Sequence, residues 1–284
     1  MSLTQKEVSE GVILFSGRHP LGVDVTSTVV HSGNDAFVFD SLYYPEDTLQ
    51  LLLSIKSMGL NPVGLMNTHW HLDHTAGNQL FRETKRIISH SQCIDLMHTD
   101  LPEQLEWARH ADKNLKEGDR IRPIYPNETI KDKSILAIGD REIVFLHTPG
   151  HTPDSIIGLL KDEHIIVAGD TVMELPYIWY GDSLALIEAL RRVKSIDGGG
   201  KIIQGHGEEC GIEKLDWDIN YIENTRKIVA EYVSSGKTVE ETKAKIQLVD
   251  CYPRDRVGSI PRVYTDIHVE NLERIYTEFT REPR

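Results

Sequence analysis

The feature that most constrains this chain is a cluster of metal-binding residue types at 68–74, Thr-His-Trp-His-Leu-Asp-His. Three histidines and one aspartate follow the pattern H-x-H-x-D-H, directly after the apolar run 62–66. Imidazole nitrogens and carboxylate oxygens are suitable ligands for zinc, iron or manganese. Their spacing does not place all four on one helical face, which requires partners three and four residues apart. The motif therefore predicts a loop at the end of a strand, wrapped around one metal ion or two.

Charge and composition restrict the partners. The chain has 284 residues, with 31 Lys and Arg against 44 Asp and Glu and a net charge of −13. A nucleic-acid backbone requires clustered positive charge, so nucleic acid is disfavoured, whereas a small anionic substrate bound to metal is not excluded. No apolar run approaches the roughly 18 residues that span a bilayer, and the first residues do not resemble a signal peptide. We expect a cytoplasmic protein with a small-molecule substrate and no membrane partner, and we leave a homodimer open.

The cysteines do not form a recognisable ligand or disulfide pattern. Cys93, Cys210 and Cys251 are far apart and include no C-x-x-C pair. A disulfide framework or a cysteine–zinc site is therefore disfavoured, and we expect free thiols.

Hydrophobic periodicity predicts strands that alternate with helices up to about residue 211. The expected strands lie at 12–15, 27–30, 36–39, 63–66, 87–88, 135–138, 143–146, 156–160, 165–168 and 202–203. The expected helices lie at 45–58, 75–83, 91–116 and 182–195, with Gly59 ending the first and a glycine run at 198–200 after the last. Residues 91–127 are either one wall of a pocket or plain surface structure.

The pattern changes after Gly211, because no further strand is indicated. Helices are expected at 212–235, 239–246 and 267–279. Their apolar faces are too incomplete to fold alone, so they should pack on the preceding core. We therefore divide the chain into a domain at 1–211 and a C-terminal helical region at 212–284.

Three further candidate ligands share the context of the first motif. His151, Asp170 and His206 each follow an apolar strand and stand beside glycine, which lets the backbone turn sharply. The complete candidate set is His69, His71, Asp73, His74, His151, Asp170 and His206. Five imidazoles and two carboxylates exceed what one tetrahedral ion can use, and they suit two ions that share a carboxylate.

A single histidine after a strand more often has a structural role, but a buried cluster of imidazoles is costly unless a metal or another partner satisfies it. His147 precedes the Thr-Pro-Gly-His turn, and we favour a structural position at a strand end over the alternative, a support for the metal site. No site role is assigned to the remaining histidines, which are His19, His31, His90, His98, His110, His164 and His268.

The chain resembles metallo-β-lactamase-fold hydrolases of the glyoxalase II-like branch. The resemblance rests on Thr-His-Trp-His-Leu-Asp-His at 68–74, Thr-Pro-Gly-His-Thr at 148–152, Ala-Gly-Asp-Thr at 168–171 and Gly-His-Gly at 205–207. Their order and spacing cover about residues 12–207. The resemblance implies an α/β (α+β) fold, a four-layer αββα sandwich of two mixed β-sheets with metals at one edge.

The resemblance also implies roles for the candidate ligands. A first metal would be held by His69, His71 and His151. A second metal would be held by Asp73, His74 and His206. Asp170 would bridge the two. Asp40, at the end of an early strand, resembles a support for the metal loop, although a simple turn role after Phe39 is an equal alternative.

The set of candidate ligands distinguishes between branches of this family. β-Lactamases of this fold have cysteine or serine at or near the position of the bridging aspartate, so Asp170 argues against antibiotic hydrolysis. The diiron flavoproteins of the fold resemble H-x-E-x-D-H, and His71 departs from that pattern. They also carry a flavodoxin domain, and no βαβ pattern follows residue 212.

These observations predict a hydrolase with two divalent metal ions, for which we expect zinc while leaving iron and manganese open. A metal-bridging hydroxide would attack a thioester, lactone or related ester, and Asp73 would orient this nucleophile. The alternatives are a phosphodiesterase or nuclease of the same fold and a mononuclear iron persulfide dioxygenase. Tyr177, Trp179 and Tyr180 follow Asp170 and either form an apolar wall for the substrate or pack the C-terminal helices.

Overall fold

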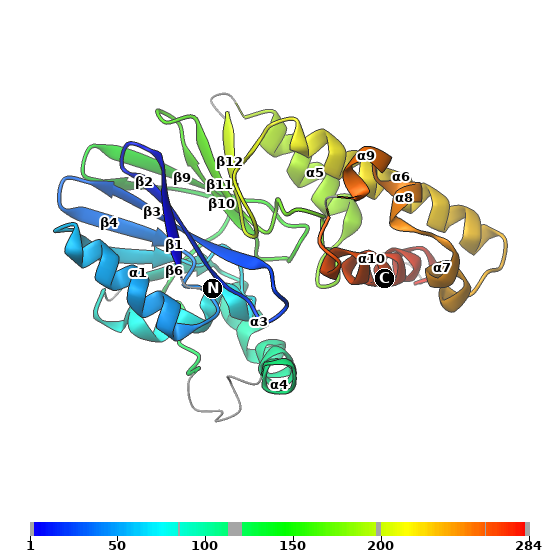
Figure 1. The fold of residues 1–284 in the computed structure, drawn as a ribbon, viewed down its shortest axis with the longest axis horizontal. Helices are drawn as coiled ribbons and strands as arrows, with labels where there is room; N and C mark the ends of the chain where they lie inside the picture. The colour runs from blue at the N-terminus through cyan, green and yellow to red at the C-terminus, as the bar shows by residue number, and fades with distance from the viewer. Residues whose placement is uncertain (1–2, 85, 113–120, 197–199, 259, 282–284) are drawn as a thin grey trace.

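Two mixed sheets pack face to face, and helices cover both outer faces (Figure 1). The computed structural model describes residues 3–84, 86–112, 121–196, 200–258 and 260–281. This arrangement confirms the αββα sandwich that the sequence predicts. Within the described residues, no helix is long and apolar enough to cross a membrane.

The first sheet contains the N-terminal strands in sequence order. Its strands are β1 (Thr4–Ser9), β2 (Val12–Arg18), β3 (Asp24–Ser32), β4 (Asp35–Phe39), β5 (Asn61–Met66), β6 (Ile87–His90) and β7 (Glu128–Ile130). Strands β1 to β4 are antiparallel neighbours, whereas β4 to β7 pair in parallel. The parallel half directs the ends of β4 and β5 to the same edge of the sheet.

The second sheet has the order β13-β12-β11-β10-β9-β8. Its strands are β8 (Lys133–Ile138), β9 (Arg141–His147), β10 (Ile156–Leu160), β11 (Ile165–Gly169), β12 (Lys201–Gln204) and β13 (Cys210–Gly211). Strands β11 and β12 pair in parallel, so these two strands also end at one edge.

The helices flank the sandwich and continue beyond it. They are α1 (Pro45–Ser57), α2 (Leu72–Thr75), α3 (Cys93–Thr99), α4 (Leu101–Ala111), α5 (Ser183–Lys194), α6 (Lys214–Ser234), α7 (Val239–Lys245), α8 (Leu248–Cys251), α9 (Arg254–Val257) and α10 (Val263–Thr280). Two short 3-10 helices, η1 (Ala76–Leu80) and η2 (Arg82–Thr84), follow α2.

Alternation along the strands divides the core into layers. In β2, Val12 and Leu14 face the second sheet, whereas Ile13 and Phe15 face the helices that cover the first sheet. Successive side chains of a strand point to opposite faces, so one strand serves both layers. The second sheet repeats this arrangement and buries its outer face under α5 and the C-terminal helices.

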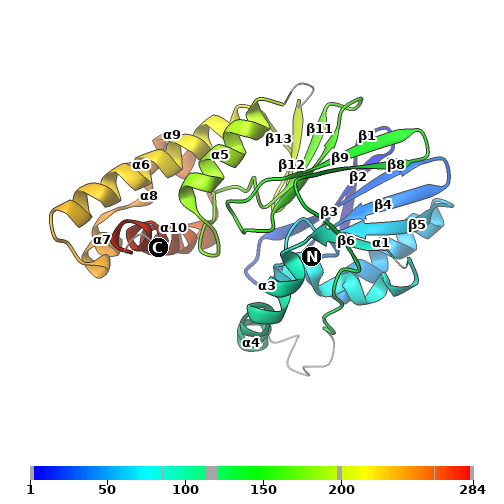
Figure 2. The same cartoon turned by 180° about the vertical axis from the view of Figure 1, so that it is seen from behind.

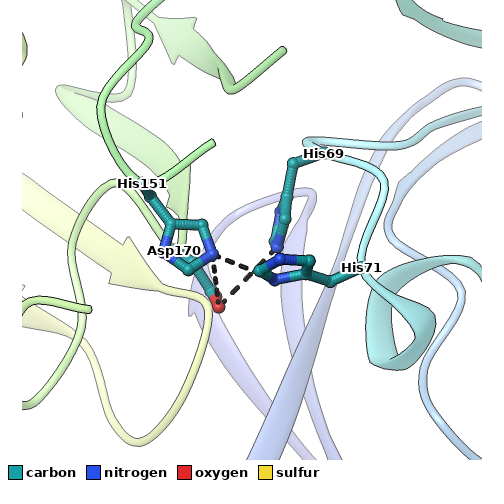
Figure 3. A group of neighbouring side chains, drawn as sticks. All are labelled: His69, His71, His151 and Asp170. Carbon is teal, nitrogen blue, oxygen red and sulfur yellow. Dashed lines mark hydrogen bonds and ion pairs between the residues drawn. The ribbon is translucent and has the colours of Figure 1, made fainter. Parts of the chain in front are cut away.

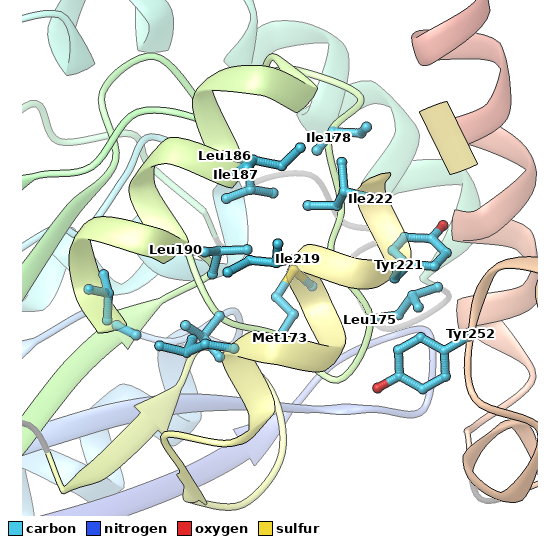
Figure 4. Packing of buried hydrophobic residues seen from close by; sticks show 14 of the residues in the cluster. Met173, Leu175, Ile178, Leu186, Ile187, Leu190, Ile219, Tyr221, Ile222 and Tyr252 are labelled. Atoms are coloured by element: carbon cyan, nitrogen blue, oxygen red, sulfur yellow. The ribbon is translucent and has the colours of Figure 1, made fainter. Parts of the chain in front are cut away.

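The C-terminal helices pack on the sandwich through α5. Leu186, Ile187 and Leu190 of α5 meet Ile219 and Ile222 of α6 in one buried cluster (Figure 4). Figure 2 shows α6, α7 and α10 extending from the end of the sandwich where α5 lies. The expected helical character of residues 212–284 is confirmed, while their division from 1–211 as a separate domain stays a prediction.

Some expected elements differ from the observed ones. The predicted helix at 75–83 is instead the single turn α2 followed by η1 and η2. Gly77 of η1 packs tightly against the preceding segment, because a Cβ atom there would lie 2.1 Å from the Ser41 carbonyl oxygen. The predicted helix 91–116 is broken into α3 and α4 at Asp100. Positions 113–116 and part of the 198–200 glycine run lie outside the described residues.

Candidate metal centre

All seven predicted ligands lie in segments that follow strands at one edge of the sandwich, five of them in loops and Asp73 and His74 in the short helix α2. His69, His71 and the start of α2 follow β5 in the first sheet. In the second sheet, His151 follows β9, Asp170 follows β11 and His206 follows β12. Residues far apart in the sequence therefore meet because parallel strands from both sheets end at the same place.

The first group of ligands comprises His69, His71, His151 and Asp170, all of which are buried (Figure 3). The His71 Nδ1 atom lies 3.1 Å from Nε2 of His151. The Asp170 Oδ2 atom lies 3.5 Å from Nε2 of His151 and 3.8 Å from Nε2 of His69. Four potential donor atoms thus converge on one small volume.

The second group comprises Asp73, His74 and His206. The Asp73 Oδ2 atom lies 3.2 Å from Nε2 of His206 and 3.5 Å from Nε2 of His74. Asp170 reaches this group too, with Oδ1 3.2 Å from His74 Nε2 and Oδ2 3.3 Å from His206 Nε2. The Asp170 carboxylate therefore stands between the two groups.

The outward-facing ring nitrogens of these histidines have fixed partners. The Nδ1 atom of His151 lies 2.7 Å from the Tyr177 carbonyl oxygen, and that of His206 lies 2.7 Å from the Asp24 carbonyl oxygen. A carbonyl only accepts hydrogen bonds, so both Nδ1 atoms must carry the proton. Each Nε2 atom then presents its lone pair to the centre of the cluster, as a metal ligand requires.

Asp40 supports the loop that carries the first motif. Its carboxylate accepts hydrogen bonds from the Thr68 backbone N–H and the Thr68 hydroxyl, both at 2.7 Å. The same carboxylate lies 2.8 Å from Nδ1 of His74. Asp40 is buried and has a φ of 59°, a left-handed conformation that aspartate and asparagine tolerate better than most residues. The structure thus places Asp40 against a predicted ligand, which a simple turn residue would not require.

The cluster has the chemistry of a metal site. Among the described residues, Nε2 of His69, Nε2 of His74 and Oδ1 of Asp170 are buried without a hydrogen-bond partner. Burial lowers the pKa of His69 well below its usual value and so favours the neutral imidazole that metals bind. Burial acts to raise the pKa of Asp170, but the imidazoles of His206 and His74 hold it well below its usual range. Burial acts to lower the pKa of His74 and of His206, but the carboxylates of Asp170 and Asp73 raise both well above the usual value. Carboxylates that attract positive charge among imidazole donors are a suitable ligand set for a divalent cation.

Glycine permits this close packing at one position in particular. A Cβ atom at Gly205 would lie 1.8 Å from Oδ1 of Asp170. Any side chain there would displace the carboxylate from between the two groups. The glycine of the Gly-His-Gly motif is therefore a geometric requirement of the cluster.

A cavity of about 500 Å³ opens directly onto the cluster and is lined by His71, Asp73, Asp170 and His206. Tyr177, Trp179 and Tyr180 all line this cavity, which is where an apolar wall for the substrate would have to lie. The Tyr180 ring also packs 5.0 Å from His71 and 5.2 Å from Trp70, measured between ring centroids.

Helices α4 and α10 complete the wall. Helix α4 contributes Glu103, Gln104 and Trp107, so the stretch 91–127 does form part of the pocket. The side chains from α10 are Val263, Tyr264, Asp266, Ile267 and Glu270.

His19 lies at this site although no sequence motif marks it, whereas His147 lies at a strand end. His19, which was assigned no site role, lines the cavity, with its Nε2 atom 3.9 Å from Asp73 Oδ2. The loop between β2 and β3 carries no local motif, so only the tertiary arrangement reveals this residue. His147 stacks on His90 at 3.9 Å and bonds the Pro153 carbonyl oxygen, in agreement with a structural role.

Comparisons with known proteins agree with this architecture. The family model of the metallo-beta-lactamase superfamily matches residues 21–206, which contain every predicted ligand. A metallo-beta-lactamase family protein from Thermus thermophilus superposes with a TM-score of 0.70 at 16% identity, covering 96% of this chain and 95% of that one. That likeness includes the C-terminal helices and concerns the fold alone. The chain belongs to the metallo-beta-lactamase superfamily.

Two curated relatives indicate the branch. The acyl-coenzyme A thioesterase MBLAC2 of Gallus gallus is 27% identical over 180 residues, covering 58% of this chain and 64% of its own length. A hydroxyacylglutathione hydrolase of Mesorhizobium japonicum is 24% identical over 166 residues, covering 57% of this chain and 54% of its own length. The chain thus spans only part of the length of these relatives. The predicted resemblance to the glyoxalase II-like branch is confirmed.

Proposed function

We propose that this protein is a dinuclear metal-dependent hydrolase of a small thioester, lactone or related ester. The observation that carries the proposal is the pair of adjoining ligand groups that share Asp170. Membership of the superfamily and the names of the thioesterase and hydroxyacylglutathione hydrolase relatives support the same class of reaction.

The residues have separate roles in this proposal. His69, His71 and His151 would hold the first ion, and Asp73, His74 and His206 would hold the second. Asp170, which stands between the two groups, would be shared by both ions. Zinc is the proposed metal because imidazole nitrogens predominate among the donors, with iron and manganese as the ions that metal analysis must distinguish. When bound, two such ions polarise an acyl carbonyl and lower the pKa of water towards neutrality.

Asp73 is the proposed catalytic residue of the protein itself. Its side chain is 14% exposed, lines the cavity and reaches His206 through Oδ2 at 3.2 Å. A carboxylate in this position can accept a hydrogen bond from the attacking water and so orient it towards the acyl carbon. A metal-activated water makes a serine nucleophile unnecessary in this proposal, and the sequence contains no G-x-S-x-G segment.

The aromatic segment after Asp170 is proposed to hold the acyl part of the substrate. Tyr177, Trp179 and Tyr180 line the cavity, and Tyr180 contacts the ring of His71. Apolar and aromatic walls with a few polar groups are typical of small-molecule sites. The same segment also packs against the C-terminal helices. The two alternatives from the sequence, a wall for the substrate and a packing surface for these helices, are therefore compatible.

The deciding experiment combines metal quantitation with a substrate panel. Purified protein is analysed for zinc, iron and manganese, and its activity is measured on a thioester, a lactone, an aryl ester, a phosphodiester and a β-lactam. We expect close to two metal ions per chain and hydrolysis of at least one of the first three substrates. Removal of metal with a chelator should abolish that activity, and added zinc should restore it.

Two results would overturn the proposal. Hydrolysis of the phosphodiester alone would indicate a phosphodiesterase. A preparation with one iron per chain that consumes oxygen in the presence of glutathione persulfide, and hydrolyses none of the panel, would indicate a dioxygenase.

A further inference from the structure

The cavity is lined by acidic side chains in addition to the predicted ligands. Glu103 from α4 and Asp266 and Glu270 from α10 all line it and are exposed at the surface. Among the described residues that line this cavity, none is lysine or arginine. The approach to the metal centre is therefore negatively charged, whereas the ions themselves would be positive.

Acidic side chains of the two helices lie beside the aromatic wall of the cavity. The Tyr177 hydroxyl hydrogen-bonds the Glu270 carboxylate. Glu103 lines the same cavity as Tyr180. Carboxylates from α4 and from α10 therefore both lie close to the aromatic wall that the substrate must pass.

Three basic side chains near these segments are engaged elsewhere, whereas Arg109 of α4 and Arg262, which precedes α10, are exposed and do not line the cavity. Arg18, beside His19, pairs with the Asp47 carboxylate at 2.7 Å. Arg274 of α10 donates to the Gly181 carbonyl oxygen, and Lys243 of α7 pairs with Glu273. None of these three cations lines the cavity, and each already has an acceptor.

Part of the cavity lining is apolar. Leu21, Trp107 and Trp179 are 47%, 43% and 37% exposed, and all three line it from separate segments of the chain. Large exposed apolar side chains that gather around a hollow commonly mark a binding surface. The Trp107 ring stacks on His19 with 6.5 Å between ring centroids, so the wall continues inward towards Asp73.

We propose that this cavity selects esters or thioesters that combine an apolar acyl or aryl group with a neutral or cationic leaving group. Esters of polyanionic carriers, such as coenzyme A, are disfavoured because the phosphates would lie among Glu103, Asp266 and Glu270. This inference rests on the proposed hydrolase function and narrows its substrate class. It also separates this chain from the relative that is named as an acyl-coenzyme A thioesterase.

The test compares one acyl group on four thiol carriers, with the full chain in its metal-loaded form. The carriers are coenzyme A, glutathione, N-acetylcysteamine and thiocholine, in order from polyanionic to cationic. We expect kcat/KM to be at least tenfold higher for the neutral and cationic thioesters than for the coenzyme A thioester. The difference should shrink in about 0.5 M salt, where the Debye length falls to a few ångströms.

Variants then locate the charge effect. Glu103→Gln combined with Asp266→Asn should raise kcat/KM for the coenzyme A thioester several-fold relative to the N-acetylcysteamine thioester. The matched control is Glu106→Gln combined with Glu231→Gln, which removes two exposed negative charges that do not line the cavity. The control should leave the ratio between the two substrates unchanged.

The outcomes separate this inference from the function on which it rests. If no carrier thioester and no lactone or aryl ester is hydrolysed, the hydrolase function fails and the selectivity with it. If kcat/KM for the coenzyme A thioester equals that for the neutral thioester, only the charge selection is overturned. An equal change of the ratio in the control variant would also overturn it, because the effect would then arise from net charge.

Discussion

The sandwich and the C-terminal helices contribute to the same site in different ways. The sandwich supplies every candidate ligand from segments that follow its strands, and these segments carry short sequence motifs. Helix α10 supplies side chains to the cavity wall only, and it reaches the aromatic segment through Asn271. The candidate ligands therefore come from the sandwich alone, whereas the wall is built by the sandwich and α10 together. Only the ligand segments carry a local motif in the sequence.

The largest expected effect comes from removing a ligand in the sandwich. Asp170→Ala or His71→Ala should reduce hydrolysis to the uncatalysed rate and lower the metal content, because each removes a donor from the cluster. Metal quantitation and activity check this, and circular dichroism should show that the fold is retained. His110→Ala removes an exposed histidine of α4 and should change none of these. Full activity in Asp170→Ala would refute the bridging role.

A smaller effect is expected from the residue that supports the metal loop. Asp40→Asn retains the size and the tolerance for a positive φ but removes the charge that faces His74 Nδ1. Loss of such outer-shell partners commonly weakens metal affinity about 10- to 100-fold. Competition with a chelating dye measures the affinity. Asp35→Asn, at the exposed start of the same strand, is the matched control, and an unchanged affinity in Asp40→Asn would leave Asp40 as a turn residue only.

The smallest effect is expected where the C-terminal helices meet the wall. The Asn271 side chain accepts from the Ile178 N–H at 3.0 Å and donates to the Pro176 carbonyl oxygen at 2.6 Å. Asn271→Ala leaves these buried groups unpaired, which should lower the free energy of unfolding by about 1–3 kcal/mol. We expect KM to rise while metal content stays constant, because the ligands come from the sandwich.

Asn224→Ala is the control for this change, since the Asn224 side chain donates to the Cys251 carbonyl oxygen, away from the cavity. Thermal unfolding and steady-state kinetics measure both variants. A loss of metal in Asn271→Ala equal to that in Asp40→Asn would contradict the separation of the two regions. Such a loss of metal would indicate that the Asn271 change reaches the ligand His151 through Tyr177, whose carbonyl oxygen accepts a hydrogen bond from the His151 ring.

Local patterns in the sequence predicted most strands and helices and the set of candidate ligands, whereas the sandwich itself followed from the resemblance to a known family. Alternating apolar residues identified β2 and β4, and glycine after an apolar run identified the loops at Asp170 and His206. Strand β1 was missed because its residues Thr4–Ser9 are mostly polar and exposed, so no alternation marks an edge strand of this kind. A different physical reason hides His19, Glu103 and Glu270 as cavity residues. Their positions follow from how distant elements pack and leave no trace in spacing.

The placement of the ligands at the edges of both sheets has a mechanical consequence. His69 and His71 come from the first sheet, whereas His151 and Asp170 come from the second. The other group likewise joins Asp73 and His74 to His206. Each bound ion would therefore be a cross-link that ties one sheet to the other along the seam where they meet. Removal of the metal should loosen that seam before the rest of the fold. Each ion can acquire its full set of ligands only after the two sheets have docked.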